Sequence, residues 1–144
     1  MEKVKVSCFH CGRTNYYPVS ASGKKVVCGR CKNALPNPGS TVEPAPQQVF
    51  NLIQNSSLPI LIVFYSPTCA SCLPMHPVVE KLARRRAGEL MVLKINISQY
   101  PDVGAVFSVQ GVPTFLIMHK GTELARSTGA MTEADFALWV ASRI

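Results

Sequence analysis

Apolar and polar residues alternate in blocks along the last two thirds of the chain, and these blocks predict both strands and helices. Two continuous apolar runs, "PILIVFY" at 59–65 and "ELMVLKINI" at 89–97, are typical of strands buried on both faces of a sheet. Between them, residues 69–88 repeat apolar positions at helical spacing and end in a glycine. We expect Pro77, inside that pattern, to kink the helix because it removes one backbone donor.

The remaining elements complete an α/β pattern. Helices are expected at 44–57, 100–109 and 131–144. Residues 112–128 predict two antiparallel strands around a Lys120–Gly121 turn. The order α-β-α-β-α-β-β-α indicates a mixed sheet flanked by helices.

The last helix, in 131–144, has a clear start signal and a predicted apolar side. Thr132 is the expected N-cap. Ala134, Leu138 and Trp139 are expected to form its apolar side.

A proline-rich connector divides the chain into two parts. The stretch "NALPNPGSTVEPAPQ" contains four prolines and a glycine, a composition typical of linkers. We therefore expect a small module at 1–34, a linker at 35–47 and a larger domain at 48–144. Within the linker, Val42 is a candidate for a short edge strand.

Composition narrows the functional class. With 47% apolar residues the chain can form a core, and no apolar run reaches the ~18 residues that span a bilayer. The start "MEKVKVSC" lacks the apolar segment of a signal peptide, so we expect a soluble cytoplasmic protein, monomeric and without a membrane partner. In that reducing compartment, cysteines favour metal binding or redox catalysis over structural disulfides.

The formal charge of +7 is concentrated in residues 1–48. A basic module suits nucleic acid or an acidic protein face. The alternative interpretation is that the lysines and arginines offset metal-bound thiolates. We favour the second interpretation and expect no nucleic-acid partner, because the module lacks a basic recognition helix.

The two outer C-x-x-C pairs predict a metal site in a zinc-ribbon-like module. They follow the spacing C-x₂-C-x₁₆-C-x₂-C, which is typical of structural zinc, and their members are Cys8, Cys11, Cys28 and Cys31. A hairpin between the pairs would bring the four sulfurs together. Two disulfides or four free thiols are the alternatives, and a reducing compartment argues against the disulfides. His10 is interpreted as a bystander, because four cysteines already complete the tetrahedron.

The central pair, Cys69 and Cys72, has a different position, between a buried strand and the expected first turn of a helix. There the helix dipole would favour a thiolate at Cys69, the attacking sulfur, and Cys72 would resolve the mixed disulfide. A third metal half-site is the alternative, but no further pair exists to complete it.

The chain resembles the thioredoxin family. The residues that carry the resemblance are "VFYSPTCASC", Pro77, "VLKIN", "GVPTF" and "KGTE", and with the cysteines of the head the whole chain is similar to the thioredoxin-2 type, which carries an N-terminal zinc finger. The resemblance implies a cis peptide before Pro113, which places the Val112 backbone to pair with a substrate strand. It also implies a protein disulfide reductase with disulfide-containing client proteins, recycled by an NADPH-dependent thioredoxin reductase, and with no organic cofactor bound.

One departure from the family pattern lies in the motif itself. Where the family usually has W-C-G-P-C, this chain has Thr68, Ala70 and Ser71 around the cysteines. An added amide and hydroxyl near the sulfurs would stabilise the thiolate. We therefore expect a reduction potential above about −270 mV, which is more oxidising than thioredoxin.

A second departure is Val63, where the family usually has a buried aspartate that accepts the proton of the resolving cysteine. We expect slower attack by Cys72 as a result. Lys94, which matches a family lysine, would lose its carboxylate partner and is expected to lie partly exposed, because a buried lone ammonium is costly.

Two alternatives to a reductase stay open. The first is an oxidase- or isomerase-like variant of the same fold with a more oxidising couple. The second is a zinc-ribbon binding module whose thioredoxin-like domain serves as a scaffold.

Overall fold

The computed structural model describes residues 3–8, 11, 13–18, 26–33, 35, 41–44, 46–56, 58–86 and 89–144. The strands are β1 (Lys3–Ser7), β2 (Thr14–Pro18), β3 (Thr41–Val42), β4 (Ile60–Tyr65), β5 (Met91–Asn96), β6 (Thr114–His119) and β7 (Thr122–Thr128). The helices are α1 (Pro46–Asn55), α2 (Met75–Arg85), α3 (Pro101–Val106) and α4 (Glu133–Ala141). From α1 onward the order confirms the expected α-β-α-β-α-β-β-α pattern.

The body is built on a five-stranded mixed sheet in the order β3-β5-β4-β6-β7. Strand β4 is central, pairing parallel with β5 and antiparallel with β6. Its residues 60–64 are all buried, as the continuous apolar run predicts. The expected edge strand also exists, since Val42 pairs in parallel with Leu93. The sheet therefore extends into the proline-rich segment.

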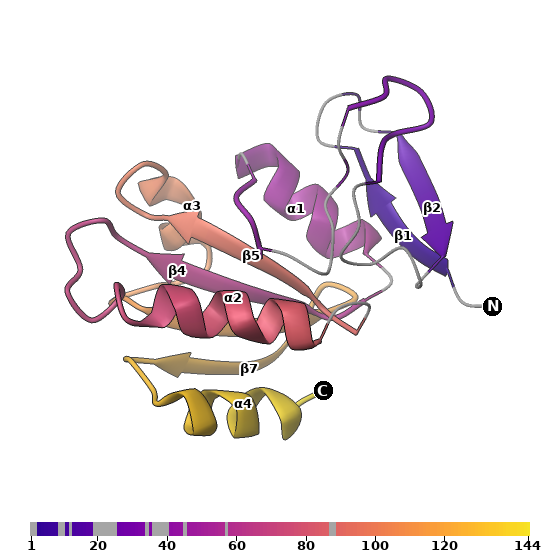
Figure 1. Cartoon of the computed structure of the whole chain (residues 1–144). Helices are drawn as coiled ribbons and strands as arrows, with labels where there is room; N and C mark the ends of the chain where they lie inside the picture. The colour runs from indigo at the N-terminus through magenta and orange to yellow at the C-terminus, as the bar shows by residue number, and fades with distance from the viewer. Residues whose placement is uncertain are drawn as a thin grey trace.

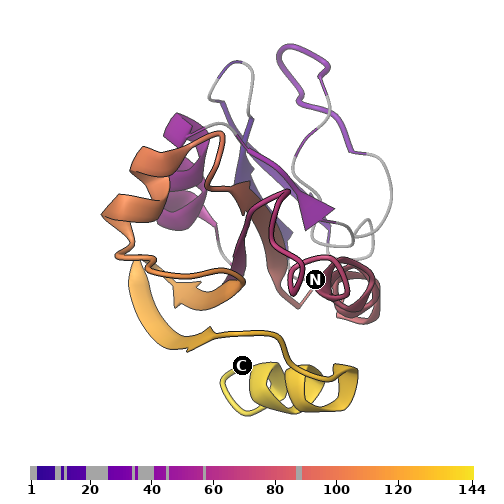
Figure 2. The ribbon, with the colours of Figure 1, turned by 90° about the vertical axis from the view of Figure 1, so that its left-hand side faces the viewer.

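Two apolar layers cover the sheet (Figures 1 and 2). Side chains of β4 point alternately to opposite faces: Ile62 and Phe64 face α1 and α3, whereas Leu61 and Val63 face α2 and α4. Figure 2, which turns the sheet nearly end-on, shows the two helix pairs on its two sides. This arrangement is the expected mixed sheet flanked by helices.

The N-terminal module is an antiparallel hairpin of β1 and β2 that lies beside α1 (Figure 1). Cys8 and Cys11 stand in the turn of this hairpin, so the hairpin encloses the first cysteine pair rather than linking the two pairs. Buried Tyr17 packs in the same apolar cluster as Leu52 of α1. Module and body therefore share one core layer. His10 lies outside the described residues.

Helix α2 begins later than expected. Its first residue is Met75, and residues 67–74 form successive turns instead. In these turns an amide donates to the carbonyl three residues earlier: the Cys72 amide donates to the Cys69 carbonyl, and the Met75 amide donates to the Cys72 carbonyl. The placement of Cys69 in the first helical turn is thus wrong. Pro77 falls in that first turn, where a missing amide breaks no intrahelical bond, so the reason for the expected kink is gone.

Helix α4 keeps its predicted cap but turns a different face inward. The Thr132 hydroxyl accepts a hydrogen bond from the Asp135 amide at 3.1 Å. The buried residues are Phe136 and Val140. Of the predicted apolar side, Trp139 packs against the same core, whereas Ala134 is exposed and Leu138 is 69% exposed, so the prediction is correct only for Trp139. Apolar residues occur around nearly the whole helix, so periodicity could not select a face.

The hairpin turn forms as expected, with Lys120 and Gly121 both at positive φ. This backbone conformation is typical of the tight turns that match strand twist. In the part of the chain that the structure describes, no helix is long and apolar enough to cross a bilayer.

Candidate redox site and candidate metal centre

The four cysteines of the head lie together in the structure. The sulfurs of Cys8 and Cys31 are 3.5 Å apart and those of Cys11 and Cys28 are 3.6 Å apart, with all four within 4.8 Å of one another. A tetrahedron of sulfurs at the Zn–S distance of about 2.3 Å has edges of about 3.8 Å. The donor set and its size therefore fit a tetrahedral thiolate metal site, and they exclude disulfides between the head cysteines in this structure.

The two cysteine-bearing turns of the N-terminal module, the knuckles at 8–13 and 28–33, have the same hydrogen bond. The Cys8 amide donates to the Arg13 carbonyl at 2.9 Å, and the Cys28 amide donates to the Asn33 carbonyl at 2.8 Å, five residues on in each case. Asn15 connects the knuckles, because its side chain accepts from the Gly29 amide and donates toward the Cys28 sulfur at 3.5 Å. Sequence reasoning did not identify this asparagine.

Amide groups around the second knuckle favour thiolates. Hydrogen bonds from the backbone of Cys31 and Arg30, and from the Asn15 side chain, lower the pKa of Cys28 to about 5. The backbone and side chain of Asn33 likewise lower the pKa of Cys31. Two of the four sulfurs are thus prepared as the anions that a metal requires.

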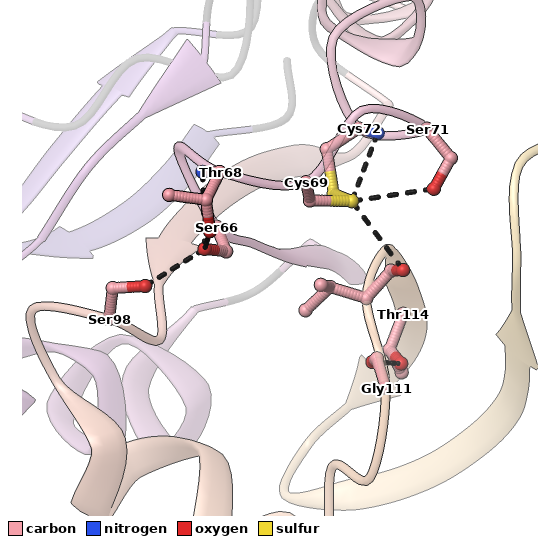
Figure 3. Close-up of a disulfide and its surroundings, with 9 residues drawn as sticks. Ser66, Thr68, Cys69, Ser71, Cys72, Ser98, Gly111 and Thr114 are labelled. Carbon is pink, nitrogen blue, oxygen red and sulfur yellow. Dashed lines mark hydrogen bonds between the residues drawn. A yellow bond between two sulfur atoms is a disulfide. The ribbon is translucent and has the colours of Figure 1, made fainter.

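The central pair forms a disulfide between Cys69 and Cys72, directly after the turn that follows β4 (Figure 3). The two sulfurs differ in exposure: Cys72 is 1% exposed, whereas Cys69 is only half-buried. The Cys72 amide donates to the Cys69 sulfur at 3.1 Å, and the Ser71 hydroxyl lies 3.3 Å from the same sulfur. Both groups can stabilise negative charge on Cys69 once the disulfide is reduced. The Cys72 amide and the Ser71 hydroxyl thus stand in place of the helix N-terminus that the sequence predicted beside Cys69.

The sheet topology brings the Val112–Pro113 segment to the disulfide. Strand β6 runs antiparallel to β4 and pairs Thr114 with Phe64, so β6 begins at the edge where β4 ends. The peptide between Val112 and Pro113 is cis, and the Val112 carbonyl oxygen lies 3.6 Å from the Cys69 sulfur. A backbone carbonyl thus lies next to the more accessible sulfur.

Hydroxyl groups line the other flank of the redox loop (Figure 3). Buried Ser66 has its hydroxyl 3.1 Å from that of Thr68 and 2.9 Å from that of Ser98, which follows β5. This network stands where the sequence departs from the family aromatic, and it ties the loop to the neighbouring strand end. No periodic pattern in the sequence signals it.

The prediction for Lys94 is wrong. Lys94 is only 9% exposed, and its ammonium forms an ion pair with the Glu80 carboxylate of α2 at 3.3 Å. Val63 is the register partner of Lys94 and is itself buried, so the carboxylate comes from the helix above instead of from the strand. A pair between residues 14 positions apart on different elements leaves no local sequence signal.

Comparisons with known proteins agree with this geometry. A family model described as Thioredoxin matches residues 40–142. The chain is 32% identical over 135 residues to "Thioredoxin C-3" from Corynebacterium nephridii, covering 94% of this chain and 92% of that protein. It is 38% identical over 85 residues to "Thioredoxin 1" from Chlorobaculum tepidum, covering 59% and 84%. A mutant thioredoxin structure from Halobacterium salinarum superposes with a TM-score of 0.65 at 22% identity, covering 74% of this chain and 92% of that one.

The similarity to the Corynebacterium nephridii protein spans more residues than the family model does. It therefore extends into the cysteine-rich head.

The Lys94–Glu80 pair gives a stability prediction. Glu80→Gln should reduce the free energy of unfolding by about 1–2 kcal/mol, less than for a fully buried pair, because Glu80 is partly exposed and solvent screens it. Lys94→Met should cost less, since it removes the charge that needs a partner. Urea unfolding of the full chain measures both.

Glu123→Gln is the matched control, because its partner Arg126 is 30% exposed at the sheet edge. We expect a change near zero there. Equal losses for Glu80→Gln and Glu123→Gln would contradict a special role for the buried pair.

Proposed function

The chain belongs to the thioredoxin family of thiol–disulfide oxidoreductases, and from that membership we propose that it is a protein disulfide reductase. The observation that carries the proposal is the unequal exposure of the two sulfurs in one disulfide. Cys69, half-buried and beside the Val112 carbonyl, is the sulfur that a client disulfide can reach. Cys72, 1% exposed, can react only within the protein.

In the proposed cycle the Cys69 thiolate attacks one sulfur of a client disulfide. A new sulfur–sulfur bond forms, the client bond breaks, and the departing client sulfur takes up a proton. Cys72 then loses its proton and attacks the Cys69 sulfur, which releases the second client thiol. The client gains two electrons and two protons, and the protein is left with the Cys69–Cys72 disulfide. The structure has the form that ends this cycle.

The Val112–Pro113 segment is proposed to orient the client. An extended client strand can pair with the backbone of Val112, whose carbonyl lies 3.6 Å from the attacking sulfur. An NADPH-dependent thioredoxin reductase is the proposed source of the two electrons that restore the dithiol. A reducing compartment, the cytoplasm, fits head cysteines that approach one another without forming disulfides.

A second candidate is an oxidase- or isomerase-like variant with a more oxidising couple. The Ser71 hydroxyl, 3.3 Å from the Cys69 sulfur, favours it, because stabilising the thiolate stabilises the reduced protein. The two candidates share the chemistry of each step and differ in the direction in which electrons flow.

We further propose that Cys8, Cys11, Cys28 and Cys31 hold a structural zinc ion. The sulfur spacing and the lowered pKa of Cys28 support the proposal. A hairpin this small has little core of its own, so the ion would supply folding free energy.

The division into a metal module at 1–34, a linker at 35–47 and a redox domain at 48–144 is likewise proposed. In this division the linker contributes strand β3 to the sheet.

The roles of the two redox cysteines predict opposite phenotypes. Cys72→Ser should accumulate a stable mixed disulfide with insulin, whereas Cys69→Ser should form none, because only Cys69 is reachable. Both variants should lose insulin reduction with dithiothreitol as electron donor. Mass spectrometry after acid quenching identifies the adduct. Trapping on Cys69→Ser in place of Cys72→Ser would reverse the assignment, and a wild-type protein without turnover would favour the scaffold alternative.

The Ser71 contact predicts a shift in reduction potential. Ser71→Ala should lower the potential of the couple by about 30 mV, since a hydrogen bond to a charged group contributes about 1.5 kcal/mol or more. Equilibration with a glutathione buffer measures it. Ser142→Ala, on the remote end of α4, should leave the potential unchanged. A wild-type potential at or below about −270 mV would count against the oxidising variant.

The metal proposal predicts about one zinc ion per chain in the purified protein, measured by elemental analysis. Cys28→Ser should lose most of the metal and lower the thermal stability, because three sulfurs no longer close the site. Cys69→Ser is the matched control and should keep the metal, since Cys69 lies outside the cluster. Equal metal loss in both variants would refute the assignment of the ligands.

A further inference from the structure

A group of polar and ionisable side chains lies next to the redox loop but takes no part in the chemistry proposed above. Its members come from four elements or their flanks: Thr41 and Glu43 from the linker end, Tyr65 from β4, His76 and Glu80 from α2, and Lys94 from β5. The group surrounds the two ends of the loop that carries Cys69 and Cys72.

The two ends of the redox loop touch each other. The loop leaves the sheet at Tyr65 and enters α2 at His76, and these two rings meet edge to face with centroids 5.0 Å apart. The Lys94 ammonium lies 6.0 Å from the Tyr65 ring centroid, and its charge helps to lower the pKa of His76. The two rings therefore close the loop at its base.

The linker bonds to both sides of that base. The Tyr65 hydroxyl donates to the Glu43 carboxylate, on the strand side of the loop. The Thr41 hydroxyl donates to the Glu80 carboxylate at 2.6 Å, on the helix side. Thr41 lies in β3, whose register with Val92 and Leu93 of β5 fixes its position in the sheet.

Both contacts pair a neutral hydroxyl donor with a carboxylate. Burial and the neighbouring Glu43 raise the pKa of Tyr65 to about 12, so the phenol keeps its proton near neutral pH. Burial and Lys94 lower the pKa of His76, which leaves its ring mainly uncharged there. The Glu80 carboxylate also carries the ion pair with Lys94. The linker is thus joined to the network that supports α2.

We propose that Thr41 and Glu43 are positioning residues for the Cys69–Cys72 couple: they clamp Tyr65 and α2, and so hold the buried Cys72 sulfur in reach of Cys69. This inference rests on the proposed disulfide exchange and deepens it. The loop between Tyr65 and His76 consists of turns closed by backbone hydrogen bonds rather than of regular helix, so the contacts at its two ends add to the restraint on the two sulfurs. Attack by Cys72 needs the two sulfurs brought together while a client occupies Cys69.

The test measures the lifetime of the mixed disulfide in the full, metal-loaded chain. Reduced protein is mixed with oxidised glutathione, quenched with acid, and the peptide containing Cys69 is followed by mass spectrometry. Cys69 attacks one glutathione sulfur and releases the first glutathione. Cys72 then displaces the second. Glutathione disulfide in large excess makes adduct formation the faster step, so the decay of the adduct reports the resolving step.

Two nearly isosteric variants remove one clamp hydroxyl each. Tyr65→Phe deletes the contact to Glu43, and Thr41→Val deletes the contact to Glu80. Each should lengthen the adduct lifetime about three- to tenfold, the range expected for loss of one hydrogen bond. Thr41→Ser, which keeps the hydroxyl, should restore the wild-type lifetime.

Matched controls separate positioning from general destabilisation. Tyr16→Phe on β2, whose side chain is 63% exposed, and Thr122→Val at the start of β7 make the same chemical changes away from the redox loop and should leave the lifetime unchanged. All measurements are made well below each variant's melting temperature. Clamp variants that lose stability but resolve at the wild-type rate would overturn the proposal, as would controls that slow the step equally. A wild-type protein whose Cys69–Cys72 dithiol is not oxidised by glutathione disulfide would instead refute the proposed disulfide exchange itself.

Discussion

The burial of β4 on both faces is the constraint on which the rest of the structure depends. A strand with no access to water must pair its backbone groups on both sides, here with β5 in parallel and β6 in antiparallel orientation. Strand β5 therefore ends, and β6 begins, at the edge where β4 ends. The residues that follow β4 and β5 and precede β6 meet there, which brings Ser98 and Val112 to the loop of Cys69. The redox site is a consequence of strand order.

The sequence predicted those features that depend on a local pattern. The apolar runs predicted β4 and β5, and the spacing of the outer pairs predicted a four-cysteine cluster that the structure brings together. The sequence did not predict features that depend on contacts between side chains far apart in the chain. Periodicity could not choose the inward face of α4, because its apolar residues encircle the helix. Glu80 was missed as the partner of Lys94, since strand register and helix placement decide that contact together.

Identical spacing leads to two kinds of chemistry because the surroundings of the sulfurs differ. In the head, each pair faces another pair at 3.5–3.6 Å, and amide groups direct hydrogen bonds to Cys28 and Cys31. Four converging thiolates repel one another unless a cation lies between them, which favours metal binding. The central pair has no facing pair among the described residues and combines an accessible sulfur with a buried one. That asymmetry suits exchange of a disulfide.

The carboxylate that balances buried Lys94 comes from a different element in this chain than in the family pattern that the chain otherwise follows. Valine at position 63 removes the carboxylate from the strand, yet Lys94 remains buried and cannot stay unpaired without a large cost. Glu80 of α2 supplies the compensating charge, and its carboxylate also accepts a hydrogen bond from the Thr41 hydroxyl. The charge balance between α2 and β5 thus involves the linker, a segment that composition alone assigns to a spacer. The five-stranded sheet accordingly begins at β3, within the proline-rich segment.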